Sequence, residues 1–220
     1  MSQASRANAT SRRTVVHLLR HGEVDNPAGV LYGRLPGFHL SEAGVLMAKR
    51  AAEAIAALDI VAVLSSPLER AVETATPASE QFQLPIRTDE RLLEPTNHFE
   101  GRTFGVGDGA LKHPSNWRHV INPFRPSWGE PYEHIAKRML AAIASARDEA
   151  RGHEALCVSH QLPIWVARRK IERKHLWHDP RRRQCALGSL TSLIFDGDDI
   201  VDVRYSEPSG AAGAGEVGGA

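Results

Sequence analysis

Three short apolar runs constrain the fold most, because each has the length of a buried strand and each ends on polar residues. The runs occupy residues 14–19, 60–66 and 155–160. The stretches between them carry apolar residues at helical spacing, over residues 42–57, 68–82 and 132–150. A hairpin over residues 189–205, with its turn at residues 196–198, completes the pattern. This alternation predicts an α/β fold, a three-layer sandwich whose mainly parallel central sheet has helices on both faces.

The domain organisation follows from where apolar residues are lacking. We expect one folded domain over residues 14–205. Residues 1–13 are polar and residues 206–220 are mostly Gly and Ala, so both segments have little to bury and we expect them to be disordered. Residues 99–131 are rich in Gly, Pro, Trp and His and show little periodicity, which indicates an insertion or cap.

Composition narrows the class of protein. The net charge of +1 creates no overall field that would favour nucleic acid or a membrane. No apolar stretch approaches the roughly 20 residues of a membrane span. Only Cys157 and Cys185 occur, and the N-terminus lacks an apolar signal region, so we expect a cytoplasmic protein without a disulfide framework. A homodimer is compatible with the sequence, which does not define the oligomeric state.

Polar side chains gather where the three predicted strands end. Arg20 and His21 follow the first strand, Arg70 lies one turn into the helix after the second, and His160 follows the third. Glu94 comes shortly after a brief extended segment. Sites in such sheets form outside the carboxyl ends of the strands. Two guanidiniums, two imidazoles and one carboxyl would make a cationic pocket suited to a phosphate monoester.

Four segments carry a resemblance to a known family. "LLRHGEV", "LSSPLERAVETA", "LLE" and "CVSHQ" occur in this order. Together they resemble the histidine phosphatase superfamily, whose members are phosphoglycerate mutase-like proteins. The resemblance covers about residues 14–205, which would then be a histidine phosphatase domain with the phosphoglycerate mutase-like fold.

The resemblance implies a role for each polar group. His21 would be the nucleophile and would carry a phosphohistidine intermediate. Arg20, Arg70 and His160 would bind the phosphoryl group. Glu94 would protonate the leaving oxygen and then act as the base for water. This chemistry requires no metal and no other cofactor, and the implied partner is a small phosphorylated substrate.

Three further residues are carried over from the same resemblance. Asn26 falls near a phosphate-contacting Asn of many members, although the spacing from Arg-His-Gly varies. The segment "YGRLPGFHLSEAG" over residues 32–44 matches the Gly-containing loop before the first helix, which would place Tyr32 and Gly33 at the pocket.

The segment after Glu94 favours hydrolysis over mutase chemistry. Mutase members carry E-R-x-Y-G after the acid, whereas this chain has "EPTNHFEGRTFG". Its Phe99-Glu100-Gly101 is closer to the W-E-G of phosphatase members. The sequence therefore predicts a phosphomonoester hydrolase, with phosphoglycerate mutase-type transfer as the alternative. A non-catalytic phosphate-binding module is a third candidate, and the intact set of His21, Glu94 and His160 argues against it.

A basic segment over residues 167–185 has no assigned role in this scheme. It holds eight Lys or Arg residues. A solvated helix face is the simplest interpretation, an anion-steering rim over the pocket comes next, and nucleic acid comes last because no known motif is present. His175, His178 and Cys185 lie in the same segment, but their spacing does not fit a zinc site.

Overall fold

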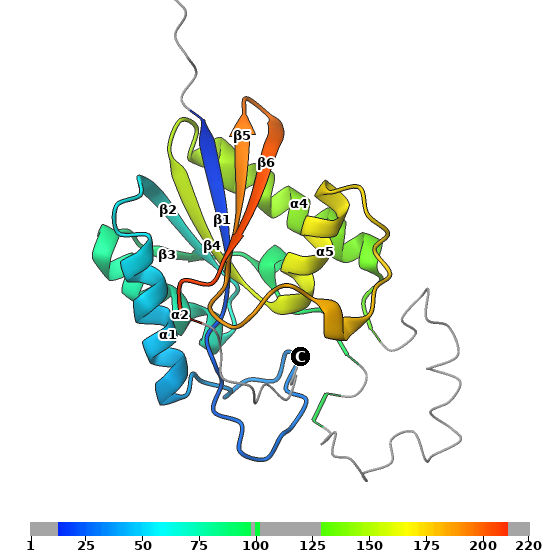
Figure 1. The fold of residues 1–220 in the computed structure, drawn as a ribbon. Coiled ribbons are helices and arrows are strands. Elements are labelled where there is room, and N and C mark those ends of the chain that lie inside the picture. The colour runs from blue at the N-terminus through cyan, green and yellow to red at the C-terminus, as the bar shows by residue number, and fades with distance from the viewer. Residues whose placement is uncertain (1–12, 98–99, 102–128, 211–220) are drawn as a thin grey trace, which may run out of the picture.

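The centre of the molecule is a six-stranded sheet, seen in a computed structural model that describes residues 13–97, 100–101 and 129–210 (Figure 1). Its strands are β1 (Thr14–Arg20), β2 (Ile60–Ser65), β3 (Ile86–Thr88), β4 (Glu154–Ser159), β5 (Leu190–Asp196) and β6 (Asp199–Ser206). They lie in the order β3-β2-β4-β1-β5-β6. The first four of these are parallel, and β5 pairs antiparallel with β1 and β6. The predicted parallel sheet with a terminal hairpin is confirmed.

Two pairs of helices cover the two faces of the sheet (Figure 1). They are α1 (Glu42–Ala54), α2 (Glu69–Phe82), α4 (Tyr132–Glu149) and α5 (Gln161–Ile171), with short 3-10 turns η1 (Glu90–Leu92) and η2 (Pro180–Arg182). Helices α1 and α2 pack on one face and α4 and α5 on the other, which confirms the three-layer sandwich. In the part of the chain that the structure describes, no helix is both long and apolar enough to cross a membrane.

Strand β1 is buried on both sides, so its residues alternate between two cores. Leu18 packs with Met139 and Ile164 on the α4 and α5 face. Its neighbour Leu19 packs with Ala75 on the opposite face, against α1 and α2. A parallel strand covered on both faces is expected to be apolar throughout, which explains the continuous run that the sequence shows here.

Strand β4 lies between β1 and β2 and aligns the ends of all three strands. Arg20 and Ser159 are register partners, so β1 and β4 end at the same level. The amide of His21 donates to the carbonyl of Ser159 at 3.1 Å, and the amide of Ser66 donates to that of Val158 at 2.9 Å. The residues that follow the three strands therefore emerge at one edge of the sheet, as predicted.

One predicted helix boundary differs from the structure. Helix α1 ends at Ala54 rather than at residue 57, because Ile55 leaves the helical conformation as its cap. Helix α5 begins at Gln161, so Pro163 lies in its first turn. A proline is tolerated in the first turn because the N–H that it lacks has no partner within the helix there.

The folded part of the chain extends beyond the predicted boundary at residue 205. Ser206 is the last residue of β6, and the described chain continues to Gly210. Ser209 is buried, and its hydroxyl contacts the carbonyl oxygens of Met47 and Gly188 at 2.9 and 3.1 Å. Residues 1–12 and 211–220, which belong to the segments expected to be disordered, and most of the predicted cap lie outside the described residues.

Gly22 allows the end of β1 to approach helix α1 closely. A Cβ atom on Gly22 would lie 2.6 Å from the carbonyl oxygen of Gly44, which is backbone. The amide of Gly22 also donates to the hydroxyl of Thr74 in α2 at 3.0 Å. The absence of a side chain at this position therefore brings α1 and α2 against the segment that carries His21.

We predict that Gly22→Ala will lower the free energy of unfolding by about 1–3 kcal/mol, the usual cost of inserting a methyl group into a packed region. The methyl group would meet helical backbone, which cannot move as a flexible side chain can. Urea denaturation would show a lower midpoint at an unchanged slope. A midpoint equal to that of the wild type would contradict the close approach.

Candidate active site

His21 is buried with one ring nitrogen engaged and the other available. Its Nδ1 lies 2.8 Å from the carbonyl oxygen of Gly22, an acceptor, so Nδ1 carries the hydrogen. Its Nε2 is buried and has no hydrogen-bond partner within the described residues. The Nε2 atom therefore keeps its lone pair, which is what a nucleophilic imidazole requires.

The surroundings of His21 keep its ring neutral. Burial lowers its pKa well below the ordinary value, and the positive charges of Arg70 and Arg20 lower it further. The hydrogen bond to Gly22 acts in the opposite direction but does not reverse the shift. Protonation would remove the lone pair, so these surroundings favour the nucleophilic form.

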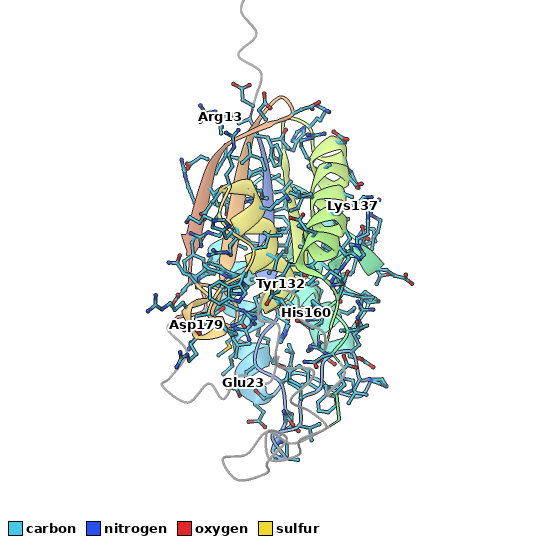
Figure 2. All side chains as sticks on the ribbon, turned by 90° about the vertical axis from the view of Figure 1, so that its right-hand side faces the viewer. Arg13, Glu23, Tyr132, Lys137, His160 and Asp179 are labelled. Carbon is cyan, nitrogen blue, oxygen red and sulfur yellow. The ribbon has the colours of Figure 1, made fainter. Side chains whose placement is uncertain are left out.

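His160 lies beside His21, with the ring centroids 5.1 Å apart and the planes at 60°. Its Nδ1 is 3.4 Å from Nη2 of Arg70, which can only donate, so Nε2–H donates to the hydroxyl of Ser66 at 2.8 Å. Burial and the charge of Arg70 lower the pKa of His160 well below its ordinary value. Figure 2 shows His160 at the end of the sheet opposite to Arg13, which precedes β1.

Two buried guanidiniums offer unused donors at the same place. Arg70 donates through Nη2 to the carbonyl of Gly33 at 2.7 Å, while its Nε and Nη1 have no described partner. Arg20 donates through Nη1 to the carbonyl of Cys185 at 2.7 Å, and its Nε has no described partner. Buried N–H groups without acceptors are costly, and guanidinium groups suit phosphate oxygens. The charges of both groups also act on His21, so these donors are available to an anion near its ring.

Glu94 brings a carboxyl group to this cationic site. It is buried, and its Oε2 is 3.8 Å from Nδ1 of His160 and has no hydrogen-bond partner among the described residues. Burial raises the pKa of Glu94, and the charges of Arg70, Arg183 and Arg20 only partly oppose this. The group therefore holds a proton to higher pH than an exposed carboxyl and can supply it to a leaving oxygen.

A comparison of the sequence with known protein families agrees with this geometry. The family model of the histidine phosphatase superfamily (branch 1) matches residues 16–207. The chain belongs to the histidine phosphatase superfamily.

Relatives of this chain include proteins named as phosphatases and as mutases. An uncharacterised protein of Mycobacterium tuberculosis is 58% identical over 196 residues, covering 89% of this chain and 97% of that protein. The 2,3-bisphosphoglycerate-dependent phosphoglycerate mutase of Thermoplasma acidophilum is 30% identical over 158 residues, covering 68% and 72%. Among solved structures, a mycobacterial glucosyl-3-phosphoglycerate phosphatase superposes with a TM-score of 0.69 at 25% identity, covering 89% and 97%.

Tyr32 and Gly33 both contact the side chain of Arg70. The guanidinium carbon of Arg70 lies 4.7 Å from the centroid of the Tyr32 ring, and Gly33 supplies the carbonyl acceptor described above. Gly33 has φ +42, and a Cβ atom there would lie 2.3 Å from Oε1 of Glu100. Both residues therefore hold the arginine, and their own contact with substrate stays a prediction.

Asn26 is engaged within its own loop. Its side-chain nitrogen donates to the carbonyl of Val30 at 2.8 Å, and its side-chain oxygen accepts from the amide of Val30 at 3.0 Å. This pair of bonds closes the loop that follows Arg-His-Gly. The amide nitrogen of Asn26 has a second N–H that could meet a phosphate oxygen, and the predicted phosphate contact stays a prediction.

The loop that carries Glu94 is held by residues that the sequence did not single out. Arg34 donates through Nε to the carbonyl of Glu94, and Arg138 donates to the carbonyl of Arg91 at 2.7 Å. Glu130 joins the two arginines, with its Oε2 2.9 Å from Arg138 and 3.7 Å from Arg34. These residues come from two distant segments without a shared motif, so only the tertiary structure reveals the network.

We predict that nitrogen-15 NMR of the histidine rings will find His21 and His160 neutral at pH 6. His21 should show a protonated Nδ1 and an unprotonated Nε2, because Gly22 fixes that tautomer. His39 is an internal control, since its exposed ring contacts Glu73 and its pKa is raised. A charged His21 at pH 6 would contradict the assignment.

The same shifts give stability a pH dependence of known sign. Unfolded histidine takes up a proton below about pH 6.5, whereas folded His21 and His160 do so only at lower pH. Between the two values the unfolded state binds more protons, so the contribution of both residues to the unfolding free energy falls as the pH drops below 6.5.

Proposed function

We propose that this protein hydrolyses the phosphate monoester of a small metabolite through a phosphohistidine intermediate at His21. The observation that carries the proposal is the neutral ring of His21, whose free Nε2 shares a buried site with unpartnered donors of Arg20 and Arg70. The buried, proton-holding carboxyl of Glu94 supports it, because such a group suits a general acid. The proposal includes no cofactor and a cytoplasmic location, and the oligomeric state stays open.

The first step transfers the phosphoryl group to the protein. Nε2 of His21 attacks phosphorus and forms a P–N bond while the bond between phosphorus and the ester oxygen breaks. Glu94 gives its proton to the departing oxygen, so an alcohol leaves and a carboxylate remains. Arg20 and Arg70 neutralise the charge on the non-bridging oxygens, a stabilisation that positioned cations supply without reorganisation.

The second step returns the protein to its starting state. The carboxylate of Glu94 takes a proton from water as the water oxygen attacks phosphorus. The P–N bond breaks, Nε2 of His21 recovers its lone pair, and inorganic phosphate leaves. One water is consumed for each ester, and Glu94 ends protonated as it began.

Phosphoglycerate mutase-type transfer is the alternative, and one relative at 30% identity carries that name. The segment after Glu94 supports hydrolysis, because Pro95, Thr96 and Asn97 replace the Arg and Tyr of the mutase pattern. In the structure, the backbone of Asn97 forms an antiparallel bridge with that of Gly129. Phe99 of the phosphatase-like Phe-Glu-Gly lies outside the described residues.

We predict that the wild-type protein will release inorganic phosphate from a panel of phosphate monoesters and that His21→Ala will lower kcat at least about a thousandfold. Quenching without acid, followed by mass spectrometry, should find a phosphoryl adduct on His21. With 3-phosphoglycerate and 2,3-bisphosphoglycerate, phosphate release should exceed isomerisation. Isomerisation faster than phosphate release would establish a mutase instead. If no ester is turned over, the remaining candidate is the non-catalytic phosphate-binding module.

We predict that Glu94→Gln will slow turnover of alkyl phosphates by about 10²–10⁴-fold, the usual contribution of a general acid. The loss with p-nitrophenyl phosphate should be much smaller, because the phenolate leaves without a proton. The ratio of the two kcat/KM values measures the effect. Glu133→Gln, which removes an exposed carboxylate paired with Lys170, is a matched control. Equal losses on both substrates would refute the proton-donor role.

A further inference from the structure

Four of the eight Lys and Arg residues in the basic segment over residues 167–185 form ion pairs at the surface. The ion pairs are Arg168–Glu172, Lys170–Glu133, Lys174–Glu172 and Arg181–Asp179, at N···O distances of 2.6–3.0 Å. Such pairs contribute little to stability and describe an ordinary solvated surface. Asp179, which precedes η2, lies toward the same end of the molecule as His160 (Figure 2). The segment therefore borders the active site.

Arg183 differs from these pairs, because its hydrogen-bond partners are two neutral side chains. It donates through Nε to Nε2 of His178 at 2.9 Å and through Nη1 to the side-chain oxygen of Gln161 at 3.1 Å. Burial lowers the pKa of His178 to about 4, and its Nδ1–H donates to the carbonyl of Leu176. Within the described ranges no carboxylate forms an ion pair with Arg183, so its positive charge is unmatched and Nη2 is left for another acceptor.

Contacts tie Arg183 to the catalytic residues. Gln161, which it contacts, directly follows His160. The side-chain nitrogen of Gln161 is 3.5 Å from the carbonyl of Cys185, and the same carbonyl accepts the bond from Arg20. The guanidinium of Arg183 is therefore anchored beside the phosphate-binding arginine rather than in open solvent.

The contacts of Arg183 with Gln161, the residue after His160, bring its positive charge within reach of Glu94. Its charge acts on the carboxyl of Glu94 more strongly than the charge of Arg20 does. In the proposed mechanism Glu94 faces the leaving oxygen, whereas Arg20 and Arg70 face the non-bridging oxygens of the phosphoryl group. A cation close to Glu94 is therefore placed to meet the alcohol portion of the substrate.

Charge balance indicates what that portion carries. A phosphate dianion matches the charges of Arg20 and Arg70, and Glu94 is neutral when substrate binds. Arg183 then adds a positive charge that a simple alkyl phosphate leaves unmatched. A partly buried cation is stabilised by an anion that shares its desolvated surroundings.

We propose that Arg183 binds a second anionic group on the alcohol portion of the substrate, which makes the preferred substrate a phosphate monoester with a further carboxylate or phosphate. This inference rests on the proposed function for its orientation, because Glu94 defines the leaving-group side. The basic segment then contributes one specificity-determining residue, and the rest of its charge stays at the surface.

Three esters on one three-carbon chain test the proposal. 3-Phosphooxypropanoate carries a carboxylate, propane-1,3-diol bisphosphate carries a second phosphate, and propane-1,3-diol monophosphate carries a neutral hydroxyl. The wild type should prefer at least one of the two esters with a second anionic group over the hydroxyl ester in kcat/KM. In Arg183→Gln that preference should fall about 10- to 100-fold, mainly through KM, as expected for one lost charge-assisted hydrogen bond. The ester whose preference falls identifies the second anion.

Arg182→Gln is the matched control, because Arg182 is the neighbouring residue and is exposed. Its preference among the three esters should stay within about twofold of the wild type. Taking a ratio between substrates removes any effect of Arg183 on the pKa of Glu94, because that effect is common to all three. An unchanged ratio in Arg183→Gln, or an equal fall in Arg182→Gln, would overturn the proposal, the latter in favour of long-range steering.

Two further measurements keep the test decisive. If Arg183→Gln does not fold, the salt dependence of the wild type provides the test. Its preference for an ester with a second anionic group should persist at 0.5 M salt, where the Debye length is about 4 Å. Loss of that preference would overturn the subsite. Calorimetric binding of the same esters to His21→Ala separates the two proposals. Tighter binding of an ester with a second anionic group, without any hydrolysis by the wild type, would refute the phosphatase and retain the anion subsite. Equal binding of all three esters would refute the subsite alone.

Discussion

The pairing of β1 and β2 on either side of β4 is the interaction on which the site depends. Backbone hydrogen bonds to the carbonyls of Val158 and Ser159 hold the first residues after both outer strands. The hydroxyl of Ser159 also donates to the carbonyl of Leu92 at 2.7 Å, which brings the loop before Glu94 to the same strand end. A rigid central strand therefore brings His21, Ser66 and the loop before Glu94 to one edge of the sheet.

Burial at that edge acts on imidazole and carboxyl in opposite directions. It lowers the pKa of His21 and His160 and raises that of Glu94, because in each case it disfavours the charged form. The guanidiniums strengthen the effect on the histidines and weaken it on the acid. A neutral nucleophile and a protonated acid are the forms that attack on a phosphate ester requires, so one desolvated cationic site prepares both partners.

The acid depends on a wider network than the phosphate site does. Strand ends carry His21, His160 and Arg20, whereas Glu94 sits in a loop whose backbone is held by Arg34 and Arg138. Glu130 joins those arginines through its side chain. The position of the Glu94 loop therefore depends on residues that lie far from it in the sequence.

The sequence by itself determined the α/β sandwich and the core of the site. A parallel strand covered on both faces must be apolar throughout, and its end must face the sheet edge, so Arg20, His21 and His160 could be placed from the linear pattern. Arg70 and Glu94 followed from their motifs. The exact boundaries could not be predicted from the sequence, because the end of α1 at Ala54 and the burial of Ser209 depend on local packing.

Only the tertiary structure decided which residues support or extend that site. Arg34 lies far in the sequence from Glu130 and Arg138, which it meets in the fold. The side chain of Arg183 is held by Gln161 and His178, whereas that of its neighbour Arg182 is exposed. The tautomer of His21 likewise depends on the conformation that places the carbonyl of Gly22 near Nδ1. Periodicity and motifs record what the chain buries, whereas the partner that each buried polar group finds is decided when distant segments pack together.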